Sequence, residues 1–114
     1  MTIDLSHFYG TERYYVHQLT GSCYTDGVKY FAGKAQAYWF IDLVMTEYHE
    51  MVKKEGFLSI TLKVSDSKAV IDVSDGNDVY ANERHIAFTD CPAGEYQFFF
   101  VKGKPNVLMV SSEY

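Results

Sequence analysis

The stretch from Thr25 to Lys54 constrains the fold most, because it has helical apolar spacing on two separate faces. At about 100° per residue, one broad stripe collects Ala37, Tyr38, Phe40, Ile41, Val44, Met45, Tyr48, Met51 and Val52. A second series, the Trp39 ridge, contains Val28, Ala32, Ala35, Trp39 and Leu43, and its last two members lie among polar residues. Large exposed apolar side chains mark contact surfaces. We therefore expect Trp39 and Leu43 to be covered by the chain's own N-terminus, a second copy or another partner.

The ends of this helical stretch are marked by residues that cap helices. Thr25 is a suitable N-cap, and Asp26 lies in the first turn, where the helix dipole favours a negative charge. Lys53 and Lys54, followed by Gly56, suit the C-terminal end. Gly33 weakens a helix interior by about 1 kcal/mol relative to alanine. One continuous helix and two helices that meet at an angle near Gly33 are both consistent with the sequence.

From Phe57 onward the apolar period becomes two, which is typical of strands with one buried face. The expected strands span residues 57–64, 68–74, 79–88, 96–101 and 107–110, with a turn at 75–77. Short turns make neighbouring strands antiparallel. We predict an α+β fold in which an aromatic N-terminal arm, with a short strand at 14–19, and a long helix pack on a five-stranded antiparallel meander. The last two strands are apolar on both sides, so the final hairpin should be covered on both faces.

Composition and charge limit the classes of function. The length of 114 residues fits one domain over 1–114 that buries its own core. A net charge of −5, with only 10 Lys and Arg residues, argues against nucleic acid as the partner. Asp42 interrupts the longest apolar run, and the N-terminus lacks the pattern of a secretory signal. We therefore expect no membrane partner and a cytoplasmic location, with Cys23 and Cys91 as free thiols.

The sequence contains no motif that indicates catalysis or a cofactor. None of the four histidines is paired with another ligand at metal-binding spacing, so no metal site is predicted. Cys91 is expected to be a small buried residue that anchors a loop, and Cys23 a structural residue. Weak candidates for a ligand pocket surround the helix entry: Tyr24, Asp26, Lys29, Tyr30 and His17. Alternatively, the residues at the helix entry form a cap that fixes how the chain enters the helix.

Aromatic residues make up 17% of the chain, which favours a function based on contact surfaces. Our leading hypothesis is a non-catalytic protein-interaction module that forms a homodimer. Its candidate interface residues lie on the Trp39 ridge and the final hairpin: Trp39, Leu43, Phe99, Val101 and Leu108. One alternative is a small acidic inhibitor of a host or competitor protein. The other is a small-molecule-binding domain or enzyme with its pocket near Tyr24, Asp26 and Lys29.

Several short blocks give the sequence a recognisable pattern. The most specific is Tyr-Thr-Asp-Gly-Val-Lys-Tyr at 24–30, and the chain ends in Ser112-Glu113-Tyr114. With Gly10-Thr11-Glu12, Ala37-Tyr38-Trp39 and Thr89-Asp90, these blocks resemble a family of small bacterial domains of unknown function. The resemblance covers nearly the whole chain. It implies a single domain found on chromosomes, plasmids and phages, and it implies no activity and no site residues.

Overall fold

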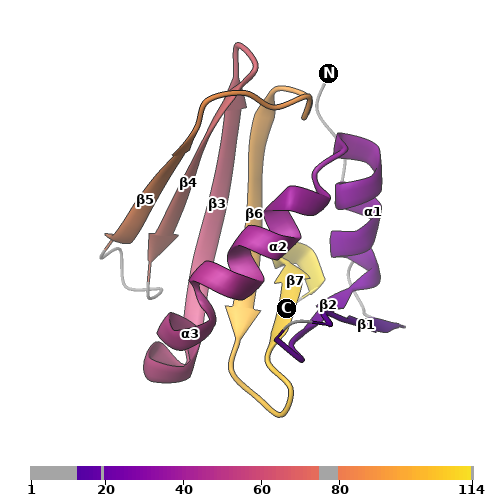
Figure 1. Cartoon of the computed structure of the whole chain (residues 1–114), viewed down its shortest axis with the longest axis vertical. Coiled ribbons are helices and arrows are strands. Elements are labelled where there is room, and N and C mark those ends of the chain that lie inside the picture. Colours follow the sequence, from indigo (N-terminus) through magenta and orange to yellow (C-terminus); the bar gives the residue numbers. More distant parts are fainter. Residues whose placement is uncertain (1–12, 19, 75–79, 114) are drawn as a thin grey trace.

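The computed structural model describes residues 13–18, 20–74 and 80–113 (Figure 1). The helices are α1 (Asp26–Ala35), α2 (Tyr38–Glu47), α3 (His49–Glu55) and the short 3-10 helix η1 (Ser111–Glu113). The strands are β1 (Tyr14–Val16), β2 (Cys23–Thr25), β3 (Phe57–Ser65), β4 (Lys68–Ser74), β5 (Tyr80–Ile86), β6 (Gly94–Val101) and β7 (Val107–Val110). The expected arm before residue 13 and the expected turn at 75–77 lie outside the described residues.

The seven strands form one mixed sheet in the order β1-β2-β7-β6-β3-β4-β5. β2 and β7 are parallel, whereas all other neighbouring pairs are antiparallel. Helices α1, α2 and α3 lie against one face of the sheet, with α1 near β2 and β7 and α3 near β3 (Figure 1). The predicted α+β class is confirmed. The five strands expected after Phe57 correspond to β3 to β7.

The prediction of a five-stranded meander is wrong in its strand order. β6 does not pair with β5, because the connection at residues 87–93 crosses the end of the β3–β4 hairpin and places β6 beside β3 (Figure 1). The backbone N–H of Thr89 donates to the Ser67 carbonyl at 2.8 Å, which attaches this connection to the hairpin turn. β6 therefore has a neighbour on each side, and β1 and β2 extend the sheet beyond β7.

The helical stretch is three helices rather than one. α1 ends at Gln36, whose left-handed backbone (φ 53°) turns the chain so that the Ala37 N–H donates back to the Ala32 carbonyl at 2.9 Å, and α2 begins after Ala37. A second interruption at Tyr48 separates α2 from α3. The break expected near Gly33 therefore lies after that residue, and Gly33 itself is in the interior of α1.

This division separates the two parts of the Trp39 ridge. Val28, Ala32 and Ala35 lie on α1 and are buried, whereas Trp39 and Leu43 lie on α2 and are partly buried against the chain's own core. The Trp39 ring meets the edge of Phe40 at a centroid distance of 6.1 Å. The Trp39 ridge is thus not a continuous surface, and packing within the chain supplies part of the cover that Trp39 needs.

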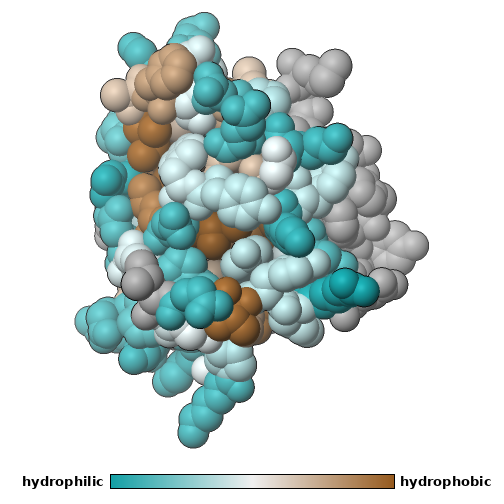
Figure 2. All heavy atoms as spheres, turned by 45° about the vertical axis from the view of Figure 1, so that its right-hand side comes forward, coloured by the Kyte–Doolittle hydropathy of each residue, from teal (hydrophilic) through white to brown (hydrophobic). Residues whose placement is uncertain are grey.

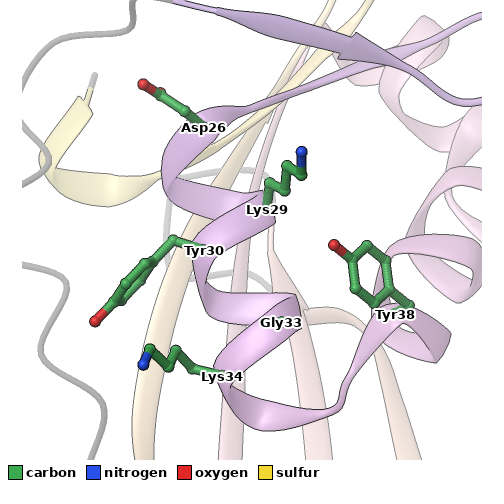
Figure 3. A pocket seen from close by; sticks show the side chains of 6 residues that line it. All are labelled: Asp26, Lys29, Tyr30, Gly33, Lys34 and Tyr38. Atoms are coloured by element: carbon green, nitrogen blue, oxygen red, sulfur yellow. The ribbon is translucent and has the colours of Figure 1, made fainter.

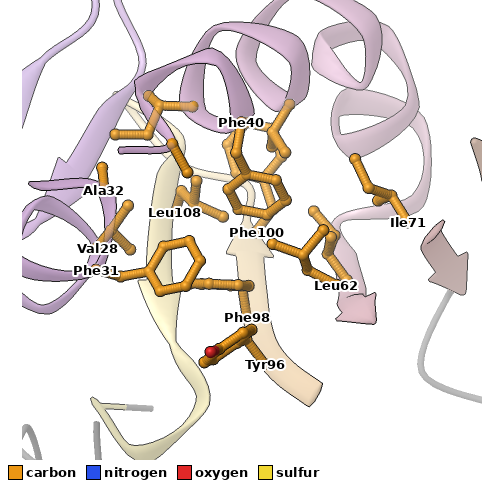
Figure 4. Packing of buried hydrophobic residues seen from close by; sticks show 14 of the residues in the cluster. Val28, Phe31, Ala32, Phe40, Leu62, Ile71, Tyr96, Phe98, Phe100 and Leu108 are labelled. Atoms are coloured by element: carbon orange, nitrogen blue, oxygen red, sulfur yellow. The ribbon is translucent and has the colours of Figure 1, made fainter. Parts of the chain in front are cut away.

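Aromatic rings fill the core between the sheet and the helices (Figure 4). Phe31 of α1 lies 5.1 Å from Phe98 and 4.9 Å from Tyr96, between ring centroids. Phe40 of α2 contacts the same Phe98 ring at 4.8 Å. Alternate residues of β3 also point into this layer, which confirms the period-two pattern seen in the sequence. The rings join α1 and α2 to the middle of the sheet and hold both helices in place.

The opposite face of the sheet has a different character. Phe57, Phe99, Val101, Val107 and Met109 are half-buried there, and the Phe57 and Phe99 rings lie 5.1 Å apart. No helix of the described chain covers this face. The final hairpin is therefore fully buried on its helix side only.

Candidate functional site

The most distinctive surface lies at the corner where β1, β2, α1 and α2 meet. Tyr15, Tyr24, Tyr30 and Tyr38 are at least partly exposed there, and we call these four residues the tyrosine surface. Figure 2 turns this side of the molecule forward; pale, weakly hydrophilic side chains cover much of its middle. Tyr38 is 47% exposed and Tyr30 37%, although both lie on ordered helices. Tyrosine residues that keep a ring in water are typical of contact surfaces.

A histidine that is almost fully buried supports one part of this surface. His17 follows β1 and is 8% exposed; its Nε2 lies 2.9 Å from Asp42 Oδ1 on α2. Its Nδ1 lies 3.1 Å from Thr20 Oγ1, and the Ser22 N–H donates weakly to that same oxygen at 3.4 Å. Nε2–H donates to the Asp42 carboxylate, and Nδ1 is within hydrogen-bond distance of the Thr20 hydroxyl. His17 thus ties the β1–β2 hairpin to α2.

A cleft of about 280 Å³ lies beside this histidine. It is lined by Val16, His17, Gln18, Tyr24, Tyr38, Ile41 and Asp42. Burial raises the pKa of the Tyr24 phenol, and nearby Tyr38, Tyr15 and Asp42 raise it further. Tyr24 therefore stays a neutral hydroxyl at physiological pH, able both to donate and to accept a hydrogen bond.

The ring of Tyr15 connects this cleft to α1. It stacks on Tyr24 with 5.6 Å between ring centroids, and Lys29 Nζ lies 4.3 Å from the centroid of the Tyr15 ring. Such a contact between a cation and a ring face is favourable and positions the ammonium group. β1, β2 and α1 therefore present their polar and aromatic groups as one continuous surface.

A second hollow, of about 560 Å³, lies on the outer side of α1 and extends to the start of α2. Figure 3 shows its lining residues, which are Asp26, Lys29, Tyr30, Gly33, Lys34 and Tyr38. Tyr30 and Lys34 lie on one side of the helix, Lys29 and Tyr38 lie on the other, and Gly33 is between them. The two walls spread apart, so this hollow is an open groove across α1. We call it the α1 groove.

The entry to α1 is held by the C-terminal end of the described chain. The Thr25 hydroxyl donates to Glu113 Oε1 at 2.6 Å and accepts from the Val28 N–H at 3.3 Å, which confirms Thr25 as the N-cap. The same carboxylate oxygen accepts from the Val110 N–H at 2.9 Å. A Cβ on Gly27 would lie 2.6 Å from that oxygen. Thr25 and Gly27 of the block at 24–30 therefore meet Glu113 of the chain-terminal block and form a structural clamp.

The expected ligand residues are only partly brought together. His17 and Tyr24 line the cleft, whereas Asp26, Lys29 and Tyr30 line the α1 groove. Tyr38 belongs to both hollows, and Asp42 completes the contact with His17. Sequence reasoning missed Asp42 because it lies on the polar side of α2, and it assigned Tyr38 to the core stripe. No local pattern links either residue to His17.

The expected interface residues are placed differently from one another. Leu108 is fully buried in the core beneath the helices, so it is not a surface residue of this fold. Phe99 and Val101 are half-buried on the opposite face of the sheet, and Trp39 and Leu43 are partly buried on α2. These five residues do not form one surface.

His17 and Cys91 both have their side-chain nitrogen or sulfur atoms engaged within the fold. Both ring nitrogens of His17 are engaged within the chain, so neither is free to accept a proton from a substrate. Cys91 lies in the crossing connection, where burial raises its thiol pKa to about 11, as expected for a loop anchor. Within residues 13–18, 20–74 and 80–113, no three His, Cys, Asp or Glu side chains gather as metal ligands do.

Comparisons with other proteins identify a family and no function. The model of a family described as "Family of unknown function (DUF6876)" matches residues 1–114. No curated protein and no solved structure matches the chain. Among the described helices, none is long and apolar enough to cross a membrane.

Proposed function

This chain belongs to a family of unknown function, and we propose that it is a non-catalytic protein-interaction module that binds its partner through the tyrosine surface. One observation carries the proposal. In the described part of the chain, five large apolar or aromatic side chains are exposed, namely Tyr14, Val16, Tyr30, Tyr38 and Phe88. Tyr30 and Tyr38 belong to the tyrosine surface, and Tyr14 and Val16 lie next to Tyr15 on β1, so only Phe88 is remote from it. Such local concentration is typical of a contact surface rather than of scattered exposure.

The chemistry of the corner suits protein binding. Tyrosine offers a large contact area with few rotatable bonds, and its hydroxyl stays hydrogen-bonded at a wet rim. Tyr24 and Tyr38 lie on a strand and a helix that the His17–Asp42 contact holds together. Binding through these residues therefore costs little conformational entropy. Lys29 and Lys34 add charge beside the rings, which favours specificity over mere adhesion.

Site-specific photocrosslinking in cells that carry the gene would test this proposal. A photoreactive phenylalanine analogue replaces Tyr38 in one variant, Tyr30 in a second and Phe88 in a third. Phe88 is the matched control because it is 69% exposed and lies outside the tyrosine surface. We expect defined adducts from positions 38 and 30 and none of the same mass from position 88.

The mass of the adduct also identifies the kind of partner. A species of twice the chain mass means a second copy and supports the homodimer. A heavier or lighter species means another protein. The absence of any adduct from positions 38 and 30, or equal adducts from position 88, would contradict the proposal.

A further inference from the structure

In the described part of the chain, no neighbour of Gly33 requires a glycine at this position. Gly33 lies in the interior of α1 without a left-handed backbone, and among residues 13–18, 20–74 and 80–113 a Cβ at this position would meet nothing within 4 Å. Glycine in a helix interior costs about 1 kcal/mol relative to alanine. Gly27 in the same helix is different, because the clamp with Glu113 leaves no room for a Cβ. A glycine that the chain's own packing does not need suits close approach by something outside the chain.

Gly33 forms the floor of the α1 groove. Tyr30 and Lys34 form one wall, and Lys29 and Tyr38 form the other (Figure 3). Because these walls spread to opposite sides of α1, an occupant that contacts both must pass over Gly33. Two helices approach closely when small residues lie at their crossing point, and their side chains then interdigitate on either side. The groove has the shape that a crossing helix requires.

The charge of the groove indicates what that helix carries. Two lysines and one aspartate line it, which gives a local excess of positive charge on a chain whose net charge is −5. Lys29 lies against the Tyr15 ring, and Lys34 Nζ lies 5.8 Å from the centroid of the Tyr30 ring. These contacts hold one ammonium group on each side of Gly33. An acidic partner segment complements such an arrangement.

We propose that the α1 groove binds an acidic helix of a partner protein, which crosses α1 over Gly33 and places carboxylates near Lys29 and Lys34. This inference rests on the proposed function and names the partner element that the tyrosine surface receives. Tyr30 and Tyr38 flank the crossing helix and cover its apolar side chains. Glycine at position 33 is then retained for binding at the expense of helix stability.

The test selects binders from a displayed library of helical hairpins in which the outward face of one helix is randomised. The target is the full chain. We expect the enriched helices to have an excess of Asp and Glu over the starting library. Lys29→Gln combined with Lys34→Gln should weaken their binding about tenfold, because it removes both cations. The matched control, Lys53→Gln with Lys54→Gln on α3, removes the same charge elsewhere and should leave binding unchanged.

Gly33→Ala gives the sharper measurement. It should raise the stability of the free protein and yet weaken binding of the selected helices about tenfold, because the new Cβ lies at the crossing point. A reduced affinity in a better-folded variant is not explained by misfolding. The inference is overturned if no helix is enriched, if the enriched helices lack acidic excess, or if Gly33→Ala binds them as well as the wild type. Photocrosslinks at position 38 together with any of these results would leave the proposed function standing and reject only the acidic helix.

Discussion

Gly27 and Gly33 lie in the same helix, but only Gly27 is required by packing. The Glu113 carboxylate, held by Thr25 and the Val110 N–H, occupies the space where a Gly27 side chain would begin. The sequence predicted Thr25 as the N-cap because capping is a local property. It did not predict the role of Gly27, because Glu113 comes from the other end of the chain.

Alanine substitution should therefore have opposite effects at these two glycines. Gly27→Ala forces Glu113 or Val110 to move and should lower the free energy of unfolding by about 1–3 kcal/mol. Gly33→Ala meets no neighbour among the described residues and should raise the free energy of unfolding by up to about 1 kcal/mol. Urea unfolding of the two variants measures both effects.

The cause of the Gly27 effect can be isolated in a double-mutant cycle. In a Glu113→Ala background, Gly27→Ala should cost less than it does in the wild type, because the clashing carboxylate is gone. An equal cost in both backgrounds would show that Glu113 is not the obstacle.

Glu113 should also make stability depend on pH. Burial raises the pKa of this carboxyl above its ordinary 4.5, and nearby Asp26 raises it further, although hydrogen bonds from Thr25 and Val110 oppose the shift. Protonation of the Glu113 carboxyl therefore stabilises the folded state. This contribution to the free energy of unfolding is fully present at pH values below the pKa of Glu113 in the unfolded chain. It is lost as the pH rises through the higher pKa of Glu113 in the folded protein.

Glu113→Gln removes this dependence because the amide keeps an acceptor oxygen and has no charge. Relative to the wild type, we expect the variant to gain stability as the pH is raised from about 4 to 7. Chemical unfolding across that range measures the difference, with Glu95→Gln on the exposed sheet face as the control. A wild-type advantage that grows with pH would contradict the assignment.

At the scale of elements, the β1–β2 hairpin is attached to α2 by the contact between His17 and Asp42. β1 has three residues and lies at the edge of the sheet, where few contacts hold a strand. The sequence predicted a short strand here and gave His17 as a weak ligand candidate. In the structure His17 lines the cleft, and both of its ring nitrogens bond within the chain, so the side chain also positions the hairpin.

Loss of this contact should loosen the hairpin without unfolding the core. Asp42→Ala removes the acceptor for His17 Nε2, and the exposed position of Asp42 on α2 limits any packing loss. We expect amide hydrogen exchange to become faster in β1 and β2 and to stay unchanged in β3 and β4. Asp42→Asn retains an acceptor oxygen and should exchange more like the wild type. Equal protection of the β1 amides against hydrogen exchange in the wild type and in Asp42→Ala would show that the His17–Asp42 contact does not hold the hairpin.

At the scale of the whole molecule, the strand order is the main feature that the sequence did not predict. A hairpin turn and a connection that crosses two strands can have similar length and composition. The Thr89 N–H attaches the connection at residues 87–93 to the β3–β4 turn, and the buried Thr89 hydroxyl accepts from the Cys91 N–H within the connection. β6 then lies between β7 and β3, which places alternate β6 residues, Tyr96, Phe98 and Phe100, beneath the helices.

Engineered disulfides distinguish this order from a meander. Thr61 and Gln97 are register partners on β3 and β6, so Thr61→Cys with Gln97→Cys should form a crosslink on mild oxidation. Glu83→Cys with Gln97→Cys should not, because β5 and β6 are separated by two strands and the Cα atoms lie about 14 Å apart. Loss of free thiols, measured by mass, reports each bond. A bond between positions 83 and 97 would instead support the meander.

The sequence by itself determined the local features of this protein: helical residues before Phe57, strands after it, the cap at Thr25, and which strand residues face the core. These follow from periods of about 3.6 and 2 and from hydrogen bonds between residues close in the chain. Only the tertiary structure decided the helix break at Gln36, the strand order, the parallel β2–β7 pair and the meeting of His17 with Asp42. The strand pairings and the His17–Asp42 contact join distant residues, and the break at Gln36 lets α1 and α2 pack separately, so each depends on how the whole core is filled rather than on any local pattern.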